Sequence, residues 1–403
     1  MIRLRKILKI ILISLVLVCL FFQNAFADEL TENEPVNWAV PDQAGNPPRQ
    51  NIPPKVEAGA AIVLDMNSKR VLYEKNAFSR KAMASTTKIM TAIVAIENGN
   101  LEDKVTVSKR AAAIGGSKIY LKAGQVLTLK ELLYGLLLES GNDAAVAIAE
   151  HIGGSVDGFV EMMNKKAREM GLKDTSFKTP HGLDAPGHYS TAYELALMAS
   201  YALRYKTFAD IVATKSASIS IGGLNNTNEM LDIYPGADGV KTGYTSQAGR
   251  CLVTSATRDN WRIISVVLNC YSRNSRARDS KSILDYAFTH FKPYTLLKQG
   301  EIVGEVPVAR GAVSSVPVQA IEGFEIPLSQ EEIKGMHKEV SLSDRVEAPV
   351  YAGVEVGRIR YVCDGKVIAE TALKTVEDVR RKGFFDYFRD VLTYWMGLIR
   401  PEG

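Results

Sequence analysis

The sequence predicts an α/β domain, a small all-β domain behind it, and an amphipathic helix at the C-terminus. Strand-like runs stand at both ends of residues 58–292 with alanine-rich helical patterns between them, which predicts one domain whose terminal segments share a sheet. From Pro293 the pattern changes to short β-like runs, which predicts a second domain over residues 293–375. The composition, 46% hydrophobic and 23% charged over 403 residues, excludes collagen, coiled coil and full disorder.

The charge balance argues against a nucleic-acid-binding protein. Lys and Arg number 49 against 45 Asp and Glu, a net charge of +4. Arg3, Arg5, Lys6 and Lys9 account for this excess, and no acidic residue stands among the first 27 positions, so the rest of the chain is neutral. A neutral chain lacks the basic field that attracts phosphate, so no nucleic-acid partner is expected.

The first 27 residues are typical of a secretory signal peptide. Four basic residues precede the apolar run Ile10–Phe22, and Ala25-Phe26-Ala27 offers small residues where a signal peptidase reads them. An uncleaved anchor is the alternative, but Gln23-Asn24 interrupts the apolar run before it spans a bilayer comfortably. We therefore expect an exported chain that begins with an extended, proline-rich linker over residues 28–57.

The first domain is expected to combine strands and helices. Asn67-Ser68 marks a turn between two strands, and Gly99, Gly153 and Gly171 stand near helix ends as stop signals. Polar residues Arg258–Asn260 predict the tip of a β-hairpin. The predicted elements are strands at Gly59–Leu64 and Arg70–Tyr73, helices at Lys88–Asn98, Leu129–Leu138, Ala144–His151 and Val156–Met170, hairpin strands at Gly249–Thr257 and Trp261–Asn269, and a helix at Ser280–Phe288.

The cysteines are predicted to be free thiols. Cys19 leaves with the signal peptide, and Cys251, Cys270 and Cys363 remain, an odd number. Counting back from the turn at Arg258–Asn260 does not place Cys251 and Cys270 opposite each other, which disfavours a bridge between them.

The second domain is expected to be all-β and to hold no cluster of catalytic side chains. Asp364-Gly365 is a strong two-residue hairpin signal between two strand-like runs. The predicted strands are Ile302–Val308, Val316–Ala320, Val340–Leu342, Arg358–Cys363 and Lys366–Leu373.

Residues 376–403 are predicted to be a membrane-anchoring tail. Apolar residues recur at steps of four and three, which predicts one face of a helix, after the basic cluster Arg380–Lys382. The stretch is too short and too charged to span a bilayer, so we expect it to lie in the membrane surface. A helix packed on the protein's own body is the alternative. The face consists of Phe384, Phe388, Val391, Trp395 and Leu398.

Three short motifs carry the predicted chemistry. They are Ser85-Thr86-Thr87-Lys88, Ser140-Gly141-Asn142 and Lys241-Thr242-Gly243. Each motif alone is a weak signal, because a Ser and a Lys three residues apart arise by chance in a chain of this length. Their joint order is far more specific, with the first motif opening an apolar helix and the third opening a hairpin region.

The first two motifs suit a serine nucleophile. Ser85 and Lys88 are one helical turn apart, so Lys88 can take the serine proton if it is partly neutral. Burial and a second cation both favour the neutral amine, and Lys241 would be that cation. Ser140 can relay a proton to a leaving amine, and Asn142 can hold a substrate amide.

The third motif suits substrate binding. Lys241 and Thr242, on a strand edge, can bind a carboxylate. Gly243 lets the substrate backbone approach closely, and the N–H of Tyr244 is available for an oxyanion hole.

The three motifs resemble those of low-molecular-mass penicillin-binding proteins that are serine-type D-alanyl-D-alanine carboxypeptidases. The resemblance covers residues 58–292 and, more weakly, the β domain and the tail. Its matching stretches are Ala60–Asp65, Val71–Asn76, Ala84–Thr91, Leu138–Ala144, Thr179–Gly187 and Asp238–Thr245.

The resemblance implies a β-lactamase/transpeptidase-like catalytic domain that needs no cofactor and no metal. It implies that Ser85 is acylated, that Lys88 is its base, and that Arg276 helps hold the substrate carboxylate, with Arg278 as a competing assignment. Ser140, Asn142, Lys241 and Thr242 complete the implied site.

The implied substrate is a peptidoglycan stem pentapeptide ending in D-Ala-D-Ala, and the implied inhibitors are β-lactams. The implied location is the extracytoplasmic face of the cell membrane, where the enzyme takes part in cell wall biosynthesis. Some members carry a histidine and an arginine where Tyr244 and Thr227 stand here, which leaves peptide preference open.

Rival functions fit less well. A class A β-lactamase adds a glutamate that activates water, and Thr179–Thr191 contains none. Ser85 lacks the flanking glycines of a Gly-x-Ser-x-Gly elbow, and His151 and His181 are expected to be structural. The cysteines and histidines show no zinc spacing. A DD-endopeptidase and a non-catalytic wall-binding protein remain alternatives.

Overall fold

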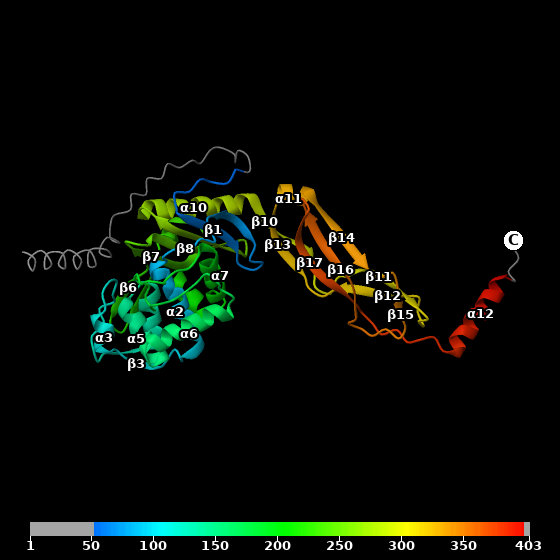
Figure 1. The fold of residues 1–403 in the computed structure, drawn as a ribbon, viewed down its shortest axis with the longest axis horizontal. Helices are drawn as coiled ribbons and strands as arrows, with labels where there is room; N and C mark the ends of the chain where they lie inside the picture. Colours follow the sequence, from blue (N-terminus) through cyan, green and yellow to red (C-terminus); the bar gives the residue numbers. More distant parts are fainter. Residues whose placement is uncertain (1–51, 399–403) are drawn as a thin grey trace, which may run out of the picture. The chain divides into compact units, whose positions relative to one another are not determined.

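The computed structural model describes residues 52–398, and side chains up to residue 395. The chain divides into two units, Met1–Thr289 and His290–Gly403 (Figure 1). The predicted signal peptide and residues 28–51 of the predicted linker lie outside the described residues.

The first unit is built on a five-stranded antiparallel sheet with the order β2-β1-β9-β8-β7. Ala60 at the start of the domain pairs with Leu268 near its end, so the prediction that the terminal segments share a sheet is confirmed. Strand β7 lies at the edge of the sheet. The strands are β1 (Ala60–Asp65), β2 (Val71–Lys75), β7 (Ala237–Thr245), β8 (Gly249–Arg258) and β9 (Trp261–Cys270).

Most helices of this unit lie between β2 and β7 in sequence. The predicted helix Lys88–Asn98 is confirmed with the same bounds, whereas the last helix begins at Arg273, earlier than predicted. The helices are η2 (Ala84–Thr87), α2 (Lys88–Asn98), α3 (Lys109–Ala113), α4 (Leu129–Leu137), α5 (Asn142–Gly153), α6 (Val156–Glu169), α7 (Ala192–Ala202), α8 (Lys206–Ala213), α9 (Met230–Ile233) and α10 (Arg273–His290). Two small two-stranded sheets are β3 (Lys104–Thr106) with β4 (Val126–Thr128), and β5 (Ser216–Ile219) with β6 (Gly222–Asn225).

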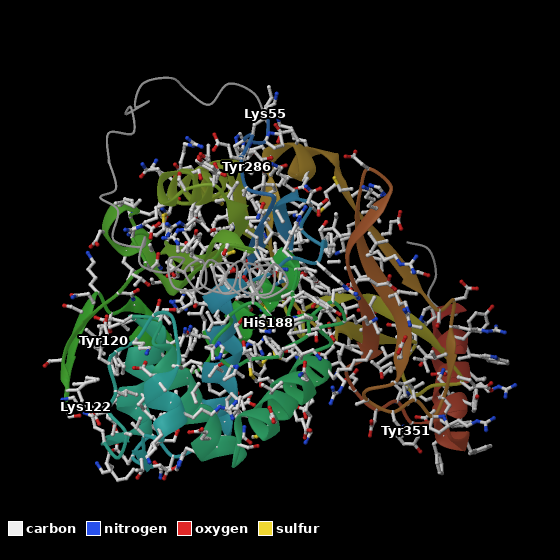
Figure 2. The ribbon with its side chains drawn as sticks, turned by 60° about the vertical axis from the view of Figure 1, so that its left-hand side comes forward. Lys55, Tyr120, Lys122, His188, Tyr286 and Tyr351 are labelled. Atoms are coloured by element: carbon white, nitrogen blue, oxygen red, sulfur yellow. The ribbon has the colours of Figure 1, made fainter. Side chains whose placement is uncertain are left out.

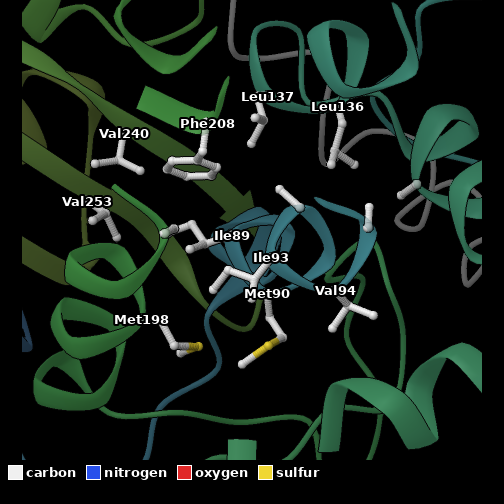
Figure 3. Close-up of a cluster of buried hydrophobic side chains, with 14 of the residues drawn as sticks. Ile89, Met90, Ile93, Val94, Leu136, Leu137, Met198, Phe208, Val240 and Val253 are labelled. Carbon is white, nitrogen blue, oxygen red and sulfur yellow. The ribbon is translucent and has the colours of Figure 1, made fainter. Parts of the chain in front are cut away.

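Helix α2 is the centre of the core of this unit (Figure 3). Every residue from Lys88 to Ala95 is buried, because the helix is apolar on nearly all sides and other elements must surround it. Figure 3 shows apolar side chains of α4, α7, α8, β7 and β8 around it: Leu136, Leu137, Met198, Phe208, Val240 and Val253. The first residues of α2 are therefore held from several directions.

The second unit is β-rich, as predicted. A six-stranded sheet has the order β14-β16-β17-β12-β11-β15, and β10 pairs with β13. Asp364 and Gly365 have φ of 49° and 72°, the left-handed values of the predicted tight hairpin turn. The elements are β10 (Phe291–Leu297), β11 (Ile302–Ala309), β12 (Ser315–Ala320), β13 (Phe324–Ser329), α11 (Gln330–Gly335), β14 (Met336–Leu342), β15 (Val346–Glu347), β16 (Glu355–Cys363) and β17 (Lys366–Thr375).

The predicted tail has two parts in the structure. Val379 is 3% exposed and exchanges hydrogen bonds with Val350, so residues 376–382 belong to the β domain. Helix α12 (Phe384–Leu398) then follows, with Phe384, Phe388, Val391 and Trp395 between 55% and 77% exposed. None of the helices within residues 52–398 combines the length and the apolar character that crossing a bilayer requires.

The three cysteines of the described chain are buried free thiols, as predicted. Cys270 pairs across the hairpin with Arg250 and not with Cys251.

Candidate active site

Ser85 and Lys88 lie side by side at the start of the core helix. Ser85 is 4% exposed and Lys88 is fully buried. Lys88 Nζ lies 2.8 Å from Ser85 Oγ, 2.7 Å from Asn142 Oδ1 and 2.7 Å from the carbonyl oxygen of His181. Three close partners fix the position of a side chain that is otherwise flexible. The structure therefore brings together the first and second predicted motifs.

The Ser85 motif forms a 3-10 helix before α2 rather than the first turn of an α-helix. The Thr86 and Thr87 hydroxyls donate to the carbonyls of Met83 and Ala84, at 2.6 and 2.8 Å, which competes with α-helical hydrogen bonding. Ala84 has a φ of 46°, a conformation that non-glycine residues adopt at a cost and that clusters at functional sites.

The second motif joins α4 to α5. Asn142 opens α5 and its Nδ2 donates to the carbonyl of Gly115 at 2.8 Å, while its Oδ1 faces Lys88. Ser140 has a φ of 61° and is 3% exposed. Within the described chain, Ser140 Oγ is buried and makes no hydrogen bond. A buried hydroxyl of this kind suits a substrate or proton-relay role better than a structural one.

The third motif lies on β7, next to Ser85. A Cβ atom on Gly243 would lie 2.9 Å from the backbone nitrogen of Ser85, so only glycine lets β7 pack this closely against η2. Lys241 and Thr242 are both 1% exposed. Lys241 Nζ donates to the Thr242 carbonyl at 3.2 Å, and Thr242 Oγ1 lies 2.8 Å from Thr227 Oγ1.

The loop of residues 179–188, to which no catalytic role was assigned from the sequence, holds these parts together. Residues 179–188 pass over the start of α2, where Pro180 accepts a hydrogen bond of 2.5 Å from Thr91 Oγ1. A Cβ atom on Gly182, which has a φ of 93°, would lie 2.0 Å from the Ala84 carbonyl oxygen. Asp184 accepts a hydrogen bond of 2.9 Å from Thr245 on β7. The loop therefore connects η2 to β7.

The two histidines of this loop are buried and structural. His188 Nε2 lies 2.8 Å from Thr87 Oγ1, and its Nδ1 accepts from the Lys178 backbone. Figure 2 labels His188 within the first unit, where it is 6% exposed. Burial lowers the pKa of His181 to about 3, with the Lys88 charge adding to the shift. Burial likewise lowers the pKa of His188 to about 4. Both rings are neutral near pH 7, and His181 contributes its backbone carbonyl to the site, a role that side-chain patterns do not reveal.

The two arginines proposed for the substrate carboxylate lie in different surroundings. Arg276 is 1% exposed, and its Nε and Nη2 donate to Glu229 at 2.7 to 3.0 Å. Arg278 is on the surface, 2.7 Å from Glu57, and the two side chains are about half exposed or more. Burial raises the pKa of Cys251 to about 11, and the Arg276 charge opposes that shift. A buried guanidinium interacts more strongly with a carboxylate than one in solvent does, so the difference in burial favours Arg276.

Tyr244 follows the third motif and carries a cation on its ring. The Arg250 guanidinium carbon lies 4.1 Å from the ring centroid, in the range of a cation–π contact. Arg250 is 5% exposed and pairs with Tyr244 across β7 and β8. Within residues 52–398 no group of three or more His, Cys, Asp or Glu side chains could hold a metal ion.

The arrangement is suited to acyl transfer. It combines a serine hydroxyl, an amine in contact with it, a second buried hydroxyl, and a strand edge with a lysine and a threonine. Substrate could extend along β7, because an edge strand offers backbone groups for pairing.

Comparisons with known proteins match this chemistry. The peptidase S11 family model, described as D-alanyl-D-alanine carboxypeptidase, matches residues 47–272. A second model, described as the C-terminal domain of penicillin-binding protein 5, matches residues 291–381. D-alanyl-D-alanine carboxypeptidase DacF of Bacillus subtilis (strain 168) is 39% identical over 84% of this chain and 90% of its own length. D-alanyl-D-alanine carboxypeptidase DacA of Escherichia coli (strain K12) is 32% identical over 97% of this chain and 98% of its own.

Solved structures agree. Penicillin-binding protein 5 from Haemophilus influenzae has a TM-score of 0.74 at 34% identity and covers 82% of this chain and 99% of its own. The DD-transpeptidase of Streptomyces K15 has a TM-score of 0.57 at 36% identity, covering 59% of this chain and 99% of its own.

Proposed function

The chain belongs to the D-alanyl-D-alanine carboxypeptidase family, and from that premise we propose that it removes the terminal D-alanine from peptidoglycan stem pentapeptides through an acyl-enzyme on Ser85. It is a serine-type DD-carboxypeptidase with a β-rich C-terminal domain of the penicillin-binding protein 5 type. The proposal covers the covalent step, the role of each residue, the sensitivity to penicillin and the place in wall biosynthesis.

The contact between Lys88 and Ser85 carries the proposal. Asn142 Oδ1 and the His181 carbonyl accept hydrogen bonds and have no hydrogen to give. A neutral amine has two hydrogens and one lone pair. If Lys88 donates its two hydrogens to these acceptors, its lone pair is directed to the Ser85 hydroxyl, 2.8 Å away. This geometry supports Lys88 as the base for the nucleophile.

The reaction then has two halves. Lys88 takes the proton of Ser85 as Oγ attacks the carbonyl carbon of the penultimate D-alanine, and backbone N–H groups of Ser85 and Tyr244 receive the oxyanion. The proton then passes from Lys88 through Ser140 to the amine of the leaving D-alanine as the peptide bond breaks, which leaves Lys88 neutral again. In the second half, Lys88 takes a proton from water as the water oxygen adds to the acyl carbon. That proton goes to Ser85 Oγ when the ester bond breaks, which restores the hydroxyl and releases the shortened stem peptide.

The substrate carboxylate is assigned to Lys241, Thr242 and Arg276. Each is buried, and the first two lie on the edge strand next to the nucleophile. Asn142 would hold a substrate amide. A buried cation and a hydroxyl form stronger hydrogen bonds with a charged end group than with an internal peptide bond.

The site fits a β-lactamase less well than a carboxypeptidase. The acid of the 179–188 loop is Asp184, and it accepts a hydrogen bond from Thr245. We therefore propose that β-lactams inhibit the enzyme by acylating Ser85, and that the acyl-enzyme is hydrolysed slowly.

We further propose that the protein is exported and held at the outer face of the cell membrane by α12. The exposed apolar face of that helix supports this location, because such a face buries its side chains when it lies in a membrane surface. The β domain would connect this anchor to the catalytic unit.

One experiment tests the central proposal. Purified protein is incubated with benzylpenicillin, and the labelled peptide is mapped by mass spectrometry, while D-alanine release from a stem pentapeptide is measured in parallel. The proposal requires the adduct on Ser85 together with release of one D-alanine per peptide. An adduct elsewhere, or release of no D-alanine, would contradict it.

A further inference from the structure

A four-residue segment joins two of the groups assigned to the substrate carboxylate. The segment Asn226–Glu229 lies between β6 and α9. Thr227 Oγ1 lies 2.8 Å from Thr242 Oγ1. Two residues later, Glu229 accepts three hydrogen bonds from Arg276, at 2.7 to 3.0 Å. One short stretch of chain therefore contacts both groups.

This segment is fixed by contacts of its own. The Asn226 side chain donates to the carbonyls of Val212 and Thr214, at 3.2 and 2.9 Å. The Thr227 backbone and hydroxyl both donate to the carbonyl of Leu138, at 3.0 and 3.1 Å. Leu138 stands two residues before Ser140. The segment is thus tied to the scaffold that also carries the second catalytic motif.

Glu229 forms a buried charge cluster with two arginines. The side chains of Arg276 and Glu229 are 1% and 3% exposed. Arg273 Nη2 lies 4.0 Å from Glu229 Oε2, and its side chain is 19% exposed. Two guanidinium groups and one carboxylate give the cluster a net charge of +1. Breaking a buried pair by removing one partner is strongly unfavourable, since a charge is then left without compensation.

The geometry sets the direction of the Arg276 guanidinium. Glu229 accepts from both Nε and Nη2, which fixes the plane of a rigid, planar group. A guanidinium held in this way keeps the direction of its other N–H groups fixed, so binding a carboxylate costs no further side-chain freedom. The pair itself is neutral, and Arg273 gives the cluster its net positive charge.

We propose that Glu229 is a positioning residue for substrate recognition, which holds the Arg276 guanidinium in the orientation that receives the terminal carboxylate of the stem peptide. This inference rests on the proposed function. Glu229 acts through Arg276, and its effect is on discrimination between a free and a blocked C-terminus rather than on the chemistry at Ser85.

The test compares a stem peptide ending in D-Ala-D-Ala with the same peptide amidated at its C-terminus. The ratio of kcat/KM for the acid to kcat/KM for the amide is measured for the wild type, Glu229→Gln, Arg276→Gln and the double variant. Glu229→Gln should lower this ratio at least fivefold, mainly through a higher KM for the acid. The double variant should show the same ratio as Arg276→Gln alone, because Glu229 has nothing to position once the guanidinium is gone.

Asp232→Asn is the matched control. It removes the same charge three residues away, in an exposed ion pair with Lys215 whose side chains are 63% and 69% exposed. Its ratio should equal that of the wild type. Benzylpenicillin labelling counts folded sites in each preparation, and the double variant, which removes both buried charges together, keeps the comparison valid if Glu229→Gln folds poorly.

Several results would overturn the inference. An unchanged ratio in Glu229→Gln, an equal fall in Asp232→Asn, or independent losses in the double variant each contradict positioning through Arg276. If the wild type discriminates acid from amide and Glu229→Gln does so equally well, only this inference fails. If the wild type does not discriminate, or releases no D-alanine, the proposed function fails and this inference with it.

Discussion

The carbonyl oxygen of Ala84 lies so close to Gly182 that a methyl group on that glycine would stand 2.0 Å from it. The residue before Ser85, the proposed nucleophile, thus contacts the 179–188 loop directly. We expect Gly182→Ala to displace η2 and to lower both the thermal midpoint and the rate of benzylpenicillin acylation. Gly171→Ala is the control, because Gly171 has a φ of 73° and open space at its Cβ position.

The Gly171→Ala control separates the cost of a left-handed alanine from the cost of the contact with Ala84. A left-handed alanine costs about 1–2 kcal/mol from backbone sterics alone. Gly171→Ala should therefore lose that much free energy of unfolding and keep the wild-type rate of acylation. Equal loss of stability in the two variants, with acylation intact in both, would show that the contact with Ala84 does not matter.

Removing the nucleophile or its base should have unequal effects. Ser85→Ala should abolish the penicillin adduct and D-alanine release. Lys88→Gln should fold and bind substrate, but acylate roughly 10²–10⁴-fold more slowly, the usual contribution of a general base. Stopped-flow acylation with a fluorescent penicillin measures this rate. An adduct that survives in Ser85→Ala would refute the assignment of the nucleophile.

Amidation of the substrate should slow the wild-type enzyme. It removes the charge that Lys241, Thr242 and Arg276 are proposed to bind. We expect a cost of about 1.5–3 kcal/mol, the range for hydrogen bonds to charged groups, measured as a lower kcat/KM for D-alanine or D-alaninamide release. Equal rates on the two peptides would indicate an endopeptidase.

The tail should be separable from the β domain at Gly383. Each buried side chain of the α12 face contributes roughly 1.5–3 kcal/mol, so mature protein without residues 1–27 should float with liposomes, and truncation after Gly383 should release it. Activity on a small soluble peptide should be unchanged. Truncation after Thr375 should also destabilise the β domain, because it removes the buried Val379. If full-length and truncated proteins both stay unbound, the anchor is refuted.

Stability should fall in mild acid because of the buried loop histidines. Their folded pKa values of about 3 and about 4 lie below the ordinary 6.5. The unfolded chain therefore binds more protons between pH 6.5 and 4, and the free energy of unfolding falls as pH drops, by up to about 1.4 kcal/mol per unit for each histidine. Urea unfolding at pH 7 and pH 5 measures the slope.

A variant identifies the source of this slope. His188→Gln should have a slope that is smaller than the wild-type slope by up to one proton. Identical slopes in the two proteins would mean that the acid sensitivity originates elsewhere.

Much of this architecture was predictable because it depends on local patterns. The apolar run after Lys88 fixes α2, and Asp364-Gly365 fixes a hairpin turn. The three motifs predict a shared site because their chemistry is complementary. Helices α7 and α8 were not predicted.

The parts that were missed depend on contacts between distant residues. Nothing near His181 in sequence reveals that its carbonyl faces Lys88, and nothing near Glu229 reveals its contact with Arg276. The division of the tail at Gly383 depends on pairing between Val350 and Val379. Such contacts arise from tertiary packing and leave no periodic signal.

The proposed catalytic groups come from three stretches that are far apart in the chain, and they meet where η2, the start of α5 and β7 come together. A half-folded molecule has the serine without its neighbours. Covalent labelling by a fluorescent penicillin would then mark native molecules alone. The ratio of labelled to total protein in living cells would then give the folding yield of this enzyme without purification.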